Sequence, residues 1–174
     1  MKSMQTRKGF TLIEILIVVI ILGILAAIVI PQFTNASKEA KQSSLVTMVQ
    51  SLRSQIALFK LQHNDMLPGA APLKDTGGMF VEGTFWDQLV LFTKLDGTTG
   101  PAKNTATGFV YGPYMQSKPA NPLVAQADAS KVKDTVFDPA VNAGNGFGFI
   151  YDYNTGLGSG KVWVVDASGN MIQQ

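Results

Sequence analysis

The chain has 174 residues, of which 15% are charged, and it contains no cysteine. The missing cysteines exclude disulfides, thiolate metal sites and cysteine nucleophiles. The formal net charge is +2, but Lys2, Arg7 and Lys8 precede Gly9, and the other eleven of the fourteen Lys and Arg residues face twelve Asp and Glu. A clustered basic surface of the kind that binds nucleic acid is therefore not expected.

The first predicted element is a membrane-spanning helix over residues 10–31. The run from Phe10 to Ile30 is almost entirely apolar, and as a helix it would be about 31 Å long, which matches the hydrocarbon thickness of a bilayer. Because cations precede it, the positive-inside rule predicts a cytoplasmic N-terminus and export of the residues that follow. An ordinary secretory signal has a shorter apolar core, so the Gly9–Phe10 junction is the better processing point.

A single carboxylate, Glu14, lies near the start of this apolar run. A charge at the centre of a bilayer costs about 3 kcal/mol or more, so it usually has a function. A plain anchor does not need Glu14, and we expect it to pair with another group. The alternative is that its side chain only reaches the nearby membrane surface.

Pro31 ends the same run. Proline lacks the N–H that would bond Ala27 and crowds the preceding turn, so a kink or a local loss of helix is expected near residues 27–31. If Pro31 is considered without the rest of the sequence, a simple kink in a membrane helix is the favoured interpretation.

The segment Lys-Gly-Phe-Thr-Leu-Ile-Glu, residues 8–14, resembles the class III signal of type IV pilins and of type II secretion pseudopilins. The resemblance covers about the first 60 residues. It implies that a prepilin peptidase cuts between Gly9 and Phe10, removes the leader 1–9 and N-methylates Phe10. Glu14 then becomes the fifth residue of the mature chain and Pro31 the twenty-second, which are the family's assembly positions.

Cleavage would create an α-amino cation at Phe10. In a growing filament, Glu14 of one subunit would neutralise the Phe10 amine of a neighbour, which offsets part of the desolvation cost and fixes the axial register. The implied partners are further copies of the chain, the peptidase, an inner-membrane assembly platform and minor pilins or pseudopilins.

Residues 32–63 carry the amphipathic half of the helix. One apolar stripe recurs at spacings of four and three, at Leu45, Val49, Leu52, Ile56 and Phe59. We therefore expect one helix from about Phe10 to Gln62, whose stripe holds the globular domain; a free coiled coil is the alternative. His63, the only histidine, is expected at the surface or at the helix C-cap.

Residues 64–174 are expected to form the globular domain. Residues 85–92 predict a short helix with Thr84 as its N-cap and aromatic residues in the core. Residues 111–122 read as an extended loop with two X-Pro turns, and residues 123–146 as a loop.

Residues 147–153 and 161–165 predict two antiparallel strands joined by a Gly-rich turn, and residues 171–173 a third strand. Phe147, Phe149, Tyr151 and Tyr153 would share one face, which should cover the helix stripe. The predicted fold class is α+β: a long N-terminal helix packed on a small C-terminal antiparallel sheet, as in pilins.

Major pseudopilins of this plan often bind calcium in their C-terminal loops. Candidate oxygen ligands are Asp128, Asp134 and Asp138, with Asp152 and Asp166. They form no recognisable calcium loop, so solvated loop aspartates are the favoured interpretation. The sequence thus predicts no cofactor, with calcium as the exception to test.

The favoured function is a structural subunit of a type IV pilus-like filament, namely a major pseudopilin of a type II secretion system. Many type IV major pilins close a C-terminal loop with a disulfide, which this chain cannot form. A major or minor type IV pilin for adhesion, motility or DNA uptake is the alternative. A membrane-anchored enzyme or binding protein is remote, because the sequence shows no nucleophile elbow, phosphate loop or metal-spaced cluster.

The expected location follows from the same motif. The chain would first be a single-pass inner-membrane protein whose C-terminal domain is periplasmic. It would then enter a periplasmic or extracellular filament.

Overall fold

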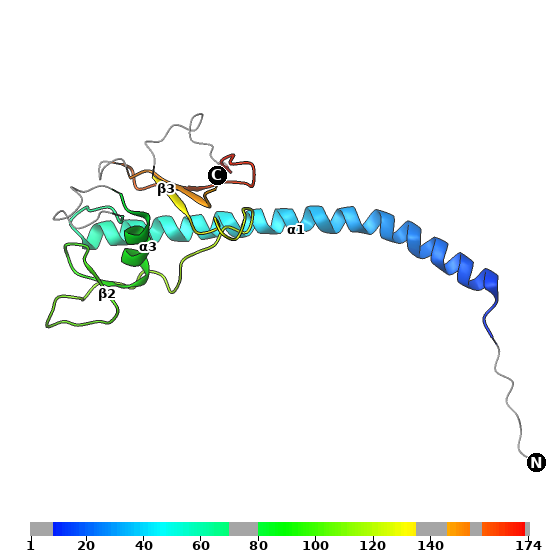
Figure 1. The fold of residues 1–174 in the computed structure, drawn as a ribbon, viewed down its shortest axis with the longest axis horizontal. Helices are drawn as coiled ribbons and strands as arrows, with labels where there is room; N and C mark the ends of the chain where they lie inside the picture. Colours follow the sequence, from blue (N-terminus) through cyan, green and yellow to red (C-terminus); the bar gives the residue numbers. More distant parts are fainter. Residues whose placement is uncertain (1–8, 70–79, 135–145, 154–157, 173–174) are drawn as a thin grey trace, which may run out of the picture. The chain divides into compact units, whose positions relative to one another are not determined.

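The structure is a computed structural model that describes residues 9–69, 80–134, 146–153 and 158–172. The chain divides into two compact units, Met1–Gln42 and Ser43–Gln174. Figure 1 traces the elements of both units, and each unit is described by itself below.

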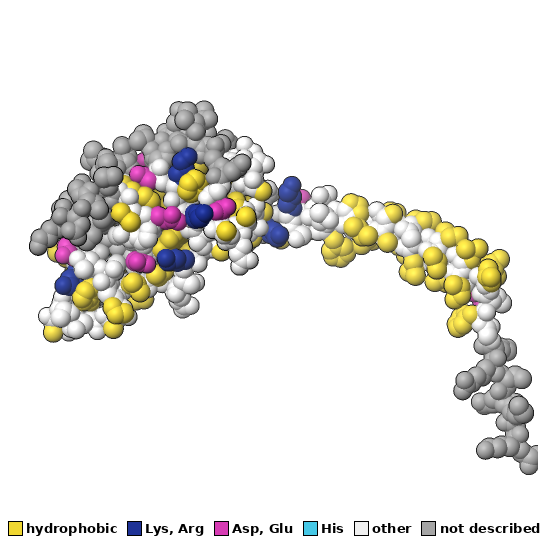
Figure 2. All heavy atoms as spheres, in the orientation of Figure 1, with side chains coloured by type: hydrophobic (Ala, Val, Ile, Leu, Met, Phe, Trp, Pro, Cys, Tyr) yellow, Lys and Arg dark blue, Asp and Glu magenta, His cyan; other side chains and the backbone are white. Residues whose placement is uncertain are grey.

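The first unit consists of the N-terminal part of α1, a helix that spans Leu12–Gln62. The helix is continuous through Pro31, so the expected local loss of helix near residues 27–31 is absent. Proline removes only one backbone hydrogen bond, and the bonds on both sides of it keep the helix intact. The side chains of this apolar stretch are exposed all round, and Figure 2 shows them as an almost unbroken hydrophobic surface.

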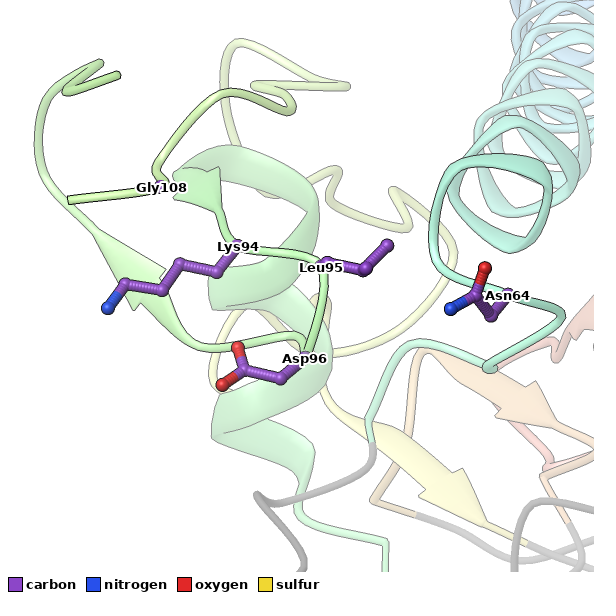
Figure 3. Close-up of a pocket in the computed structure, with 5 residues that line it drawn as sticks. All are labelled: Asn64, Lys94, Leu95, Asp96 and Gly108. Atoms are coloured by element: carbon purple, nitrogen blue, oxygen red, sulfur yellow. The ribbon is translucent and has the colours of Figure 1, made fainter. Parts of the chain in front are cut away.

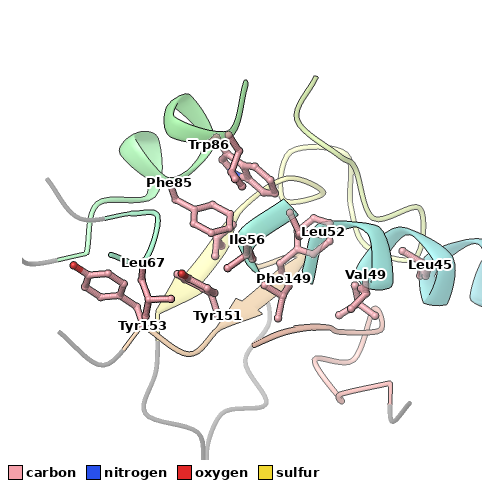
Figure 4. Close-up of a cluster of buried hydrophobic side chains, with 14 residues drawn as sticks. Leu45, Val49, Leu52, Ile56, Leu67, Phe85, Trp86, Phe149, Tyr151 and Tyr153 are labelled. Atoms are coloured by element: carbon pink, nitrogen blue, oxygen red, sulfur yellow. The ribbon is translucent and has the colours of Figure 1, made fainter. Parts of the chain in front are cut away.

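The second unit is built on the apolar stripe of α1. The five predicted stripe residues are at most 2% exposed, which confirms the periodicity. Phe149 and Tyr151 pack against this stripe from the C-terminal sheet, and Phe85 and Trp86 from a short helix, as Figure 4 shows. Leu45, Val49, Leu52 and Ile56 form one hydrophobic core with these aromatic residues, whereas Phe59 packs against His63 and Tyr114.

The C-terminal sheet has three strands in the order β3-β4-β5: Val132–Asp134, Phe149–Tyr151 and Val162–Val164. The antiparallel pair β4-β5 confirms the predicted hairpin, with Phe149 opposite Val164. Strand β3 runs parallel to β4 and lies in a segment predicted as loop, so the sheet is mixed rather than purely antiparallel.

Two physical features explain why β3 is absent from the sequence prediction. It has only three residues, two of them charged, so its local pattern carries no strand signal. Its strand structure comes from pairing with β4 and from burial of Val132. The predicted third strand at residues 171–173 amounts, within the described residues, to a single bridge from Met171 to Val165.

The short helix α3 spans Glu82–Val90 and buries Phe85, Trp86 and Leu89, as expected for core aromatic residues. Its N-cap is Val81, not Thr84, and no side chain caps it. The helix starts earlier because Phe85 N–H bonds the Val81 carbonyl, which places Thr84 inside the first turn. Two short strands follow, β1 (Phe92–Thr93) and β2 (Thr99–Gly100), as an antiparallel hairpin.

The proline-containing loop over residues 111–122 is held by a buried amide. The Asn121 side chain is 1% exposed, and its Nδ2 donates to the carbonyls of Gly148 and Val165 at 2.9 and 2.7 Å. One side chain therefore joins this loop to both sides of the β4-β5 hairpin.

His63 directly follows the last residue of α1, as expected of a C-cap residue, but it is buried at 1% exposure, so the alternative of a surface position is wrong. Its ring stacks on Phe59 at 3.9 Å, its Nδ1 lies 2.9 Å from the Phe59 carbonyl, and its Nε2 lies 3.0 Å from Thr93 Oγ1. A carbonyl only accepts, so Nδ1 carries the hydrogen and Nε2 accepts from the Thr93 hydroxyl. Burial lowers the pKa of His63.

Candidate functional site

The predicted cleavage junction lies just before α1. Gly9 and Phe10 are both exposed, and the Phe10 side chain is 84% exposed. A Cβ placed on Gly9 would meet no atom within 4 Å. The fold itself therefore does not require glycine at this position, and any requirement for it must come from outside the folded chain.

The start of α1 is closed by a reciprocal pair of hydrogen bonds between Thr11 and Glu14. Thr11 N–H donates to Glu14 Oε2 at 2.8 Å, and the Thr11 hydroxyl donates to the same oxygen at 2.7 Å. In return, Glu14 N–H donates to Thr11 Oγ1 at 3.3 Å. This is a capping box, which occupies backbone donors that the first helical turn leaves unbonded.

The capping box gives Glu14 a partner inside its own chain. Its carboxylate also lies where the positive end of the helix dipole favours a negative charge. The sequence carries the signal for this arrangement, since Thr-x-x-Glu directly precedes an apolar run. Thr11 is thus a residue of the site that the sequence interpretation missed, because Glu14 was assigned either to a group in another chain or to the membrane surface.

The helix surface that follows the capping box is apolar over its whole circumference. Side chains from Phe10 to Phe33 are 41–84% exposed wherever they are large and hydrophobic. Monomeric soluble proteins rarely expose a contiguous apolar surface of this extent. By length and composition, α1 is apolar enough over an 18-residue window to cross a membrane, and none of that window is buried.

The calcium candidates lie in different local arrangements. Asp128 forms an ion pair with Lys131 at 2.6 Å, and Asp134 Oδ1 accepts from Tyr153 N–H at 3.3 Å. Asp138 lies outside the described residues. Over the part of the chain that the structure describes, no three His, Cys, Asp or Glu side chains gather around a common point. Calcium binding stays a prediction.

The other two aspartates of that set close their own turns. Asp152 Oδ2 accepts from the backbone and hydroxyl of Ser159, and Asp166 Oδ1 accepts from the backbone of Ser168 and Asn170. The bonds from the Asn170 segment lower the pKa of Asp166. Their geometry is that of turn-stabilising carboxylates.

An open pocket of about 490 Å³ lies between the turn after α1 and the β1-β2 turn, lined by Asn64, Lys94, Leu95, Asp96 and Gly108 (Figure 3). Asp96 Oδ1 accepts from Thr98 N–H, which lowers the Asp96 pKa, and the Lys94 ammonium lies over the Phe109 ring at 4.7 Å. Asp96 is thus engaged within the β1-β2 hairpin, and Lys94 with Phe109 of the following turn. None of the predicted site residues lies in this pocket.

Comparisons with known proteins converge on the N-terminal segment. A family model described as the prokaryotic N-terminal methylation motif matches residues 4–30. The type II secretion system core protein G of Vibrio cholerae is 39% identical over 64 residues, which cover 37% of this chain and 44% of that protein. A fimbrial protein of Pseudomonas aeruginosa is 41% identical over 73 residues, which cover 42% of this chain and 47% of that protein.

A type IV major pilin of Neisseria gonorrhoeae is 33% identical over 81 residues, which cover 44% of this chain and 38% of that protein. The chain thus spans less than half the length of these curated relatives. No solved structure matches the chain. The N-terminal segment therefore carries a prepilin-type methylation motif, and the chain is similar there to type II secretion core protein G and to type IV pilins, with an α+β fold of the pilin kind.

Proposed function

We propose that the chain is a structural subunit of a type IV pilus-like filament, and specifically a major pseudopilin of a type II secretion system. The observation that carries the proposal is the exposed apolar run of α1, which begins at the methylation motif and has Glu14 as its single carboxylate. Such a surface needs either lipid or other apolar helices around it. A membrane-stored subunit that polymerises through this helix uses both environments in turn.

The proposed sequence of events begins with cleavage after Gly9 and methylation of Phe10. The new amine at Phe10 then provides a cation near Glu14 of an entering subunit. Pairing of the two charges in a dry helix bundle offsets their desolvation cost only if the geometry is good. We assign this pairing to Phe10 and Glu14 and a supporting role in assembly to Pro31; no cofactor takes part.

The proposed location follows from the same helix. The subunit first lies in the inner membrane with the unit Ser43–Gln174 on the periplasmic side, and then enters the filament. Its partners are other copies, the prepilin peptidase, the assembly platform and minor pseudopilins. The proposed activity is polymerisation rather than catalysis.

A major type IV pilin is the second candidate, because the similar proteins include the fimbrial protein of Pseudomonas aeruginosa as well as core protein G. Deletion of the gene in its native host separates the two. Loss of exported enzymes from the medium, with normal surface pili, supports the secretion subunit. Loss of surface pili with normal secretion supports the pilin, and an unchanged strain with no filament containing this chain contradicts both.

A further inference from the structure

Two lysines follow the exposed apolar run of α1 on the same helix. Lys38 and Lys41 are both exposed, and within the described residues neither forms an ion pair. No Lys or Arg lies between Phe10 and Lys38. In Figure 2 the blue cationic side chains on α1 lie beyond the end of its yellow hydrophobic surface. The helix therefore carries positive charge just beyond the part that needs an apolar environment.

The one acidic side chain of this segment, Glu39, does not face the two lysines. Lys38 and Lys41 are three positions apart, so they are neighbours on one face of the helix. Glu39 is one position from Lys38 and two from Lys41, and residues at those spacings do not face each other. Residues 31–42 contain two Lys and one Glu, a side-chain charge of +1, and the two positive charges share a face that the negative charge does not.

The distance of the lysines from the apolar run follows from the helix alone, because all of these residues lie in the unit Met1–Gln42. At a rise of about 1.5 Å per residue, Lys38 lies about 7.5 Å beyond Phe33 and Lys41 about 12 Å beyond it. Side chains of a helix lean toward its N-terminus, so both ammonium groups reach back toward the apolar run. The headgroup layer extends a bilayer by roughly 5–8 Å beyond the hydrocarbon on each side. With the apolar run in the hydrocarbon, the ammonium groups therefore lie near the level of the phosphates.

We propose that Lys38 and Lys41 bind the phosphate groups of anionic phospholipids and hold the subunit at a defined depth in the membrane. The inference rests on the proposed function, in which α1 lies in a bilayer before assembly. The lipids concerned belong to the leaflet on the side of the exported unit. Each lysine close to an anionic surface is expected to enrich such lipids by up to about fivefold.

Lipid is favoured over an acidic protein as the partner, because one rigid helix carries both the apolar run and the lysines. Placing the run in hydrocarbon places the lysines at the phosphates without any further contact. Removal of the leader, in the proposed cleavage, also leaves Lys38 and Lys41 as the only Lys or Arg residues before Arg53. They are then the cations of α1 nearest to the apolar run.

A fluorophore beside the lysines can report which lipids gather there. The chain has no native cysteine, so Ser37→Cys gives a single labelling position, exposed and four residues before Lys41 on the same face. The full-length chain is inserted into phosphatidylcholine vesicles that contain a small fraction of nitroxide-labelled phosphatidylglycerol or, in a parallel sample, of nitroxide-labelled phosphatidylcholine. Because the nitroxide quenches only nearby fluorophores, the ratio of the two quenching signals measures the local enrichment of the anionic lipid. We expect phosphatidylglycerol to quench several-fold more strongly in dilute buffer, and the excess to shrink in 1 M salt, where the Debye length is about 3 Å.

Substitutions of the lysines test whether they cause the enrichment. Lys38→Gln with Lys41→Gln should make the two quenchers nearly equal, whereas Lys38→Arg with Lys41→Arg should keep the excess. Lys103→Gln with Lys161→Gln is the matched control, since it removes two exposed lysines of the other unit with the same change in net charge. This control should leave the excess unchanged. The leader is identical in all of these chains and cancels from the comparison.

The possible failures separate the lysine site from the proposed function. Equal quenching by the two lipids, in an inserted chain that keeps both lysines, overturns the lipid site alone and directs the search to an acidic protein. An equal loss of the excess in the control pair also overturns the site, because the enrichment would then follow net charge. A full-length chain that does not float with the vesicles in a density gradient contradicts storage in a membrane, and overturns the proposed function together with the site.

Discussion

The two halves of α1 are equally helical but differ in what surrounds them. In the half before Gln42 the large apolar side chains are exposed on every face, whereas in the half after Ser43 five apolar residues form one stripe that is at most 2% exposed. The stripe has its partner within the chain, in the aromatic residues of the sheet and of α3. A helix that is apolar all round has no such partner and must find one in lipid or in other subunits.

The largest expected effect concerns the boundary of the exposed half. Gly9→Leu should leave the precursor unprocessed, because the fold leaves room for a side chain at Gly9 and the substitution therefore acts on the peptidase alone. Mass spectrometry of the membrane fraction measures the retained leader. Gly23→Ala is the matched control, since a Cβ there also meets no atom within 4 Å. Mature-length protein from Gly9→Leu would rule out the cleavage assignment.

The second effect concerns the carboxylate at the start of the exposed half. Glu14→Ala should be inserted and cleaved but assemble poorly, because it leaves the Phe10 amine of a neighbour unpaired. Loss of one partner of a buried ion pair costs about 3–5 kcal/mol, a decrease of roughly a hundredfold or more in assembly. The yield of sheared filaments measures it.

Thr11→Ala separates pairing from capping. It removes the capping hydroxyl, which is worth about 1 kcal/mol, and keeps the carboxylate. A much smaller loss of filaments than in Glu14→Ala is therefore expected. Equal losses would show that the capping box, and not the pairing of charges, is what assembly requires.

The third effect should appear only in the second unit. Leu52→Ala removes a fully buried stripe residue and should lower the free energy of unfolding by about 2–5 kcal/mol, whereas Leu16→Ala, on the exposed half, should leave it unchanged. Urea unfolding in detergent, followed by tryptophan fluorescence, measures the difference, because both tryptophans lie in the unit Ser43–Gln174. Equal effects of the two substitutions would contradict the division of the helix.

The smallest effect concerns His63 at the end of the buried half. Its pKa in the folded chain is lowered, mainly by burial, so only the unfolded chain takes up a proton as the pH falls below about 6.5. The contribution of His63 to stability should be constant above pH 7 and should fall below about 6.5, by at most about 1.4 kcal/mol per pH unit. His63→Gln should flatten this dependence between pH 7 and 5. The same slope in both proteins would mean that His63 is not its source.

The contrast between the halves also explains which features the sequence could predict. The stripe and the β4-β5 hairpin are repeated local patterns, and both are found in the structure. Of the predicted aromatic face, Phe149, Tyr151 and Tyr153 lie in the core, whereas Phe147 is only half-buried and does not. Strand β3 and the burial of His63 depend on residues distant in the sequence: Phe149 to Tyr151 for the strand, Thr93 for the histidine. The residues around β3 and around His63 therefore show no periodic pattern from which the strand or the burial could be predicted.

At the candidate site, the processing motif could be recognised from the sequence because its residues, 4–30, are contiguous in the chain. Thr84 shows the limit of such local reasoning. It is a good N-cap residue by type, but Val81 takes that position because the following turn buries Phe85 and Trp86. Burial of the core residues thus decides where α3 begins, because it contributes more free energy than a favourable N-cap residue does.

The capping box makes subunit entry into the proposed filament an exchange of partners. Before assembly, Glu14 is already bonded to Thr11 of its own chain. Pairing with a neighbouring amine then replaces bonds that already exist, so the free energy released is only the difference between the two arrangements.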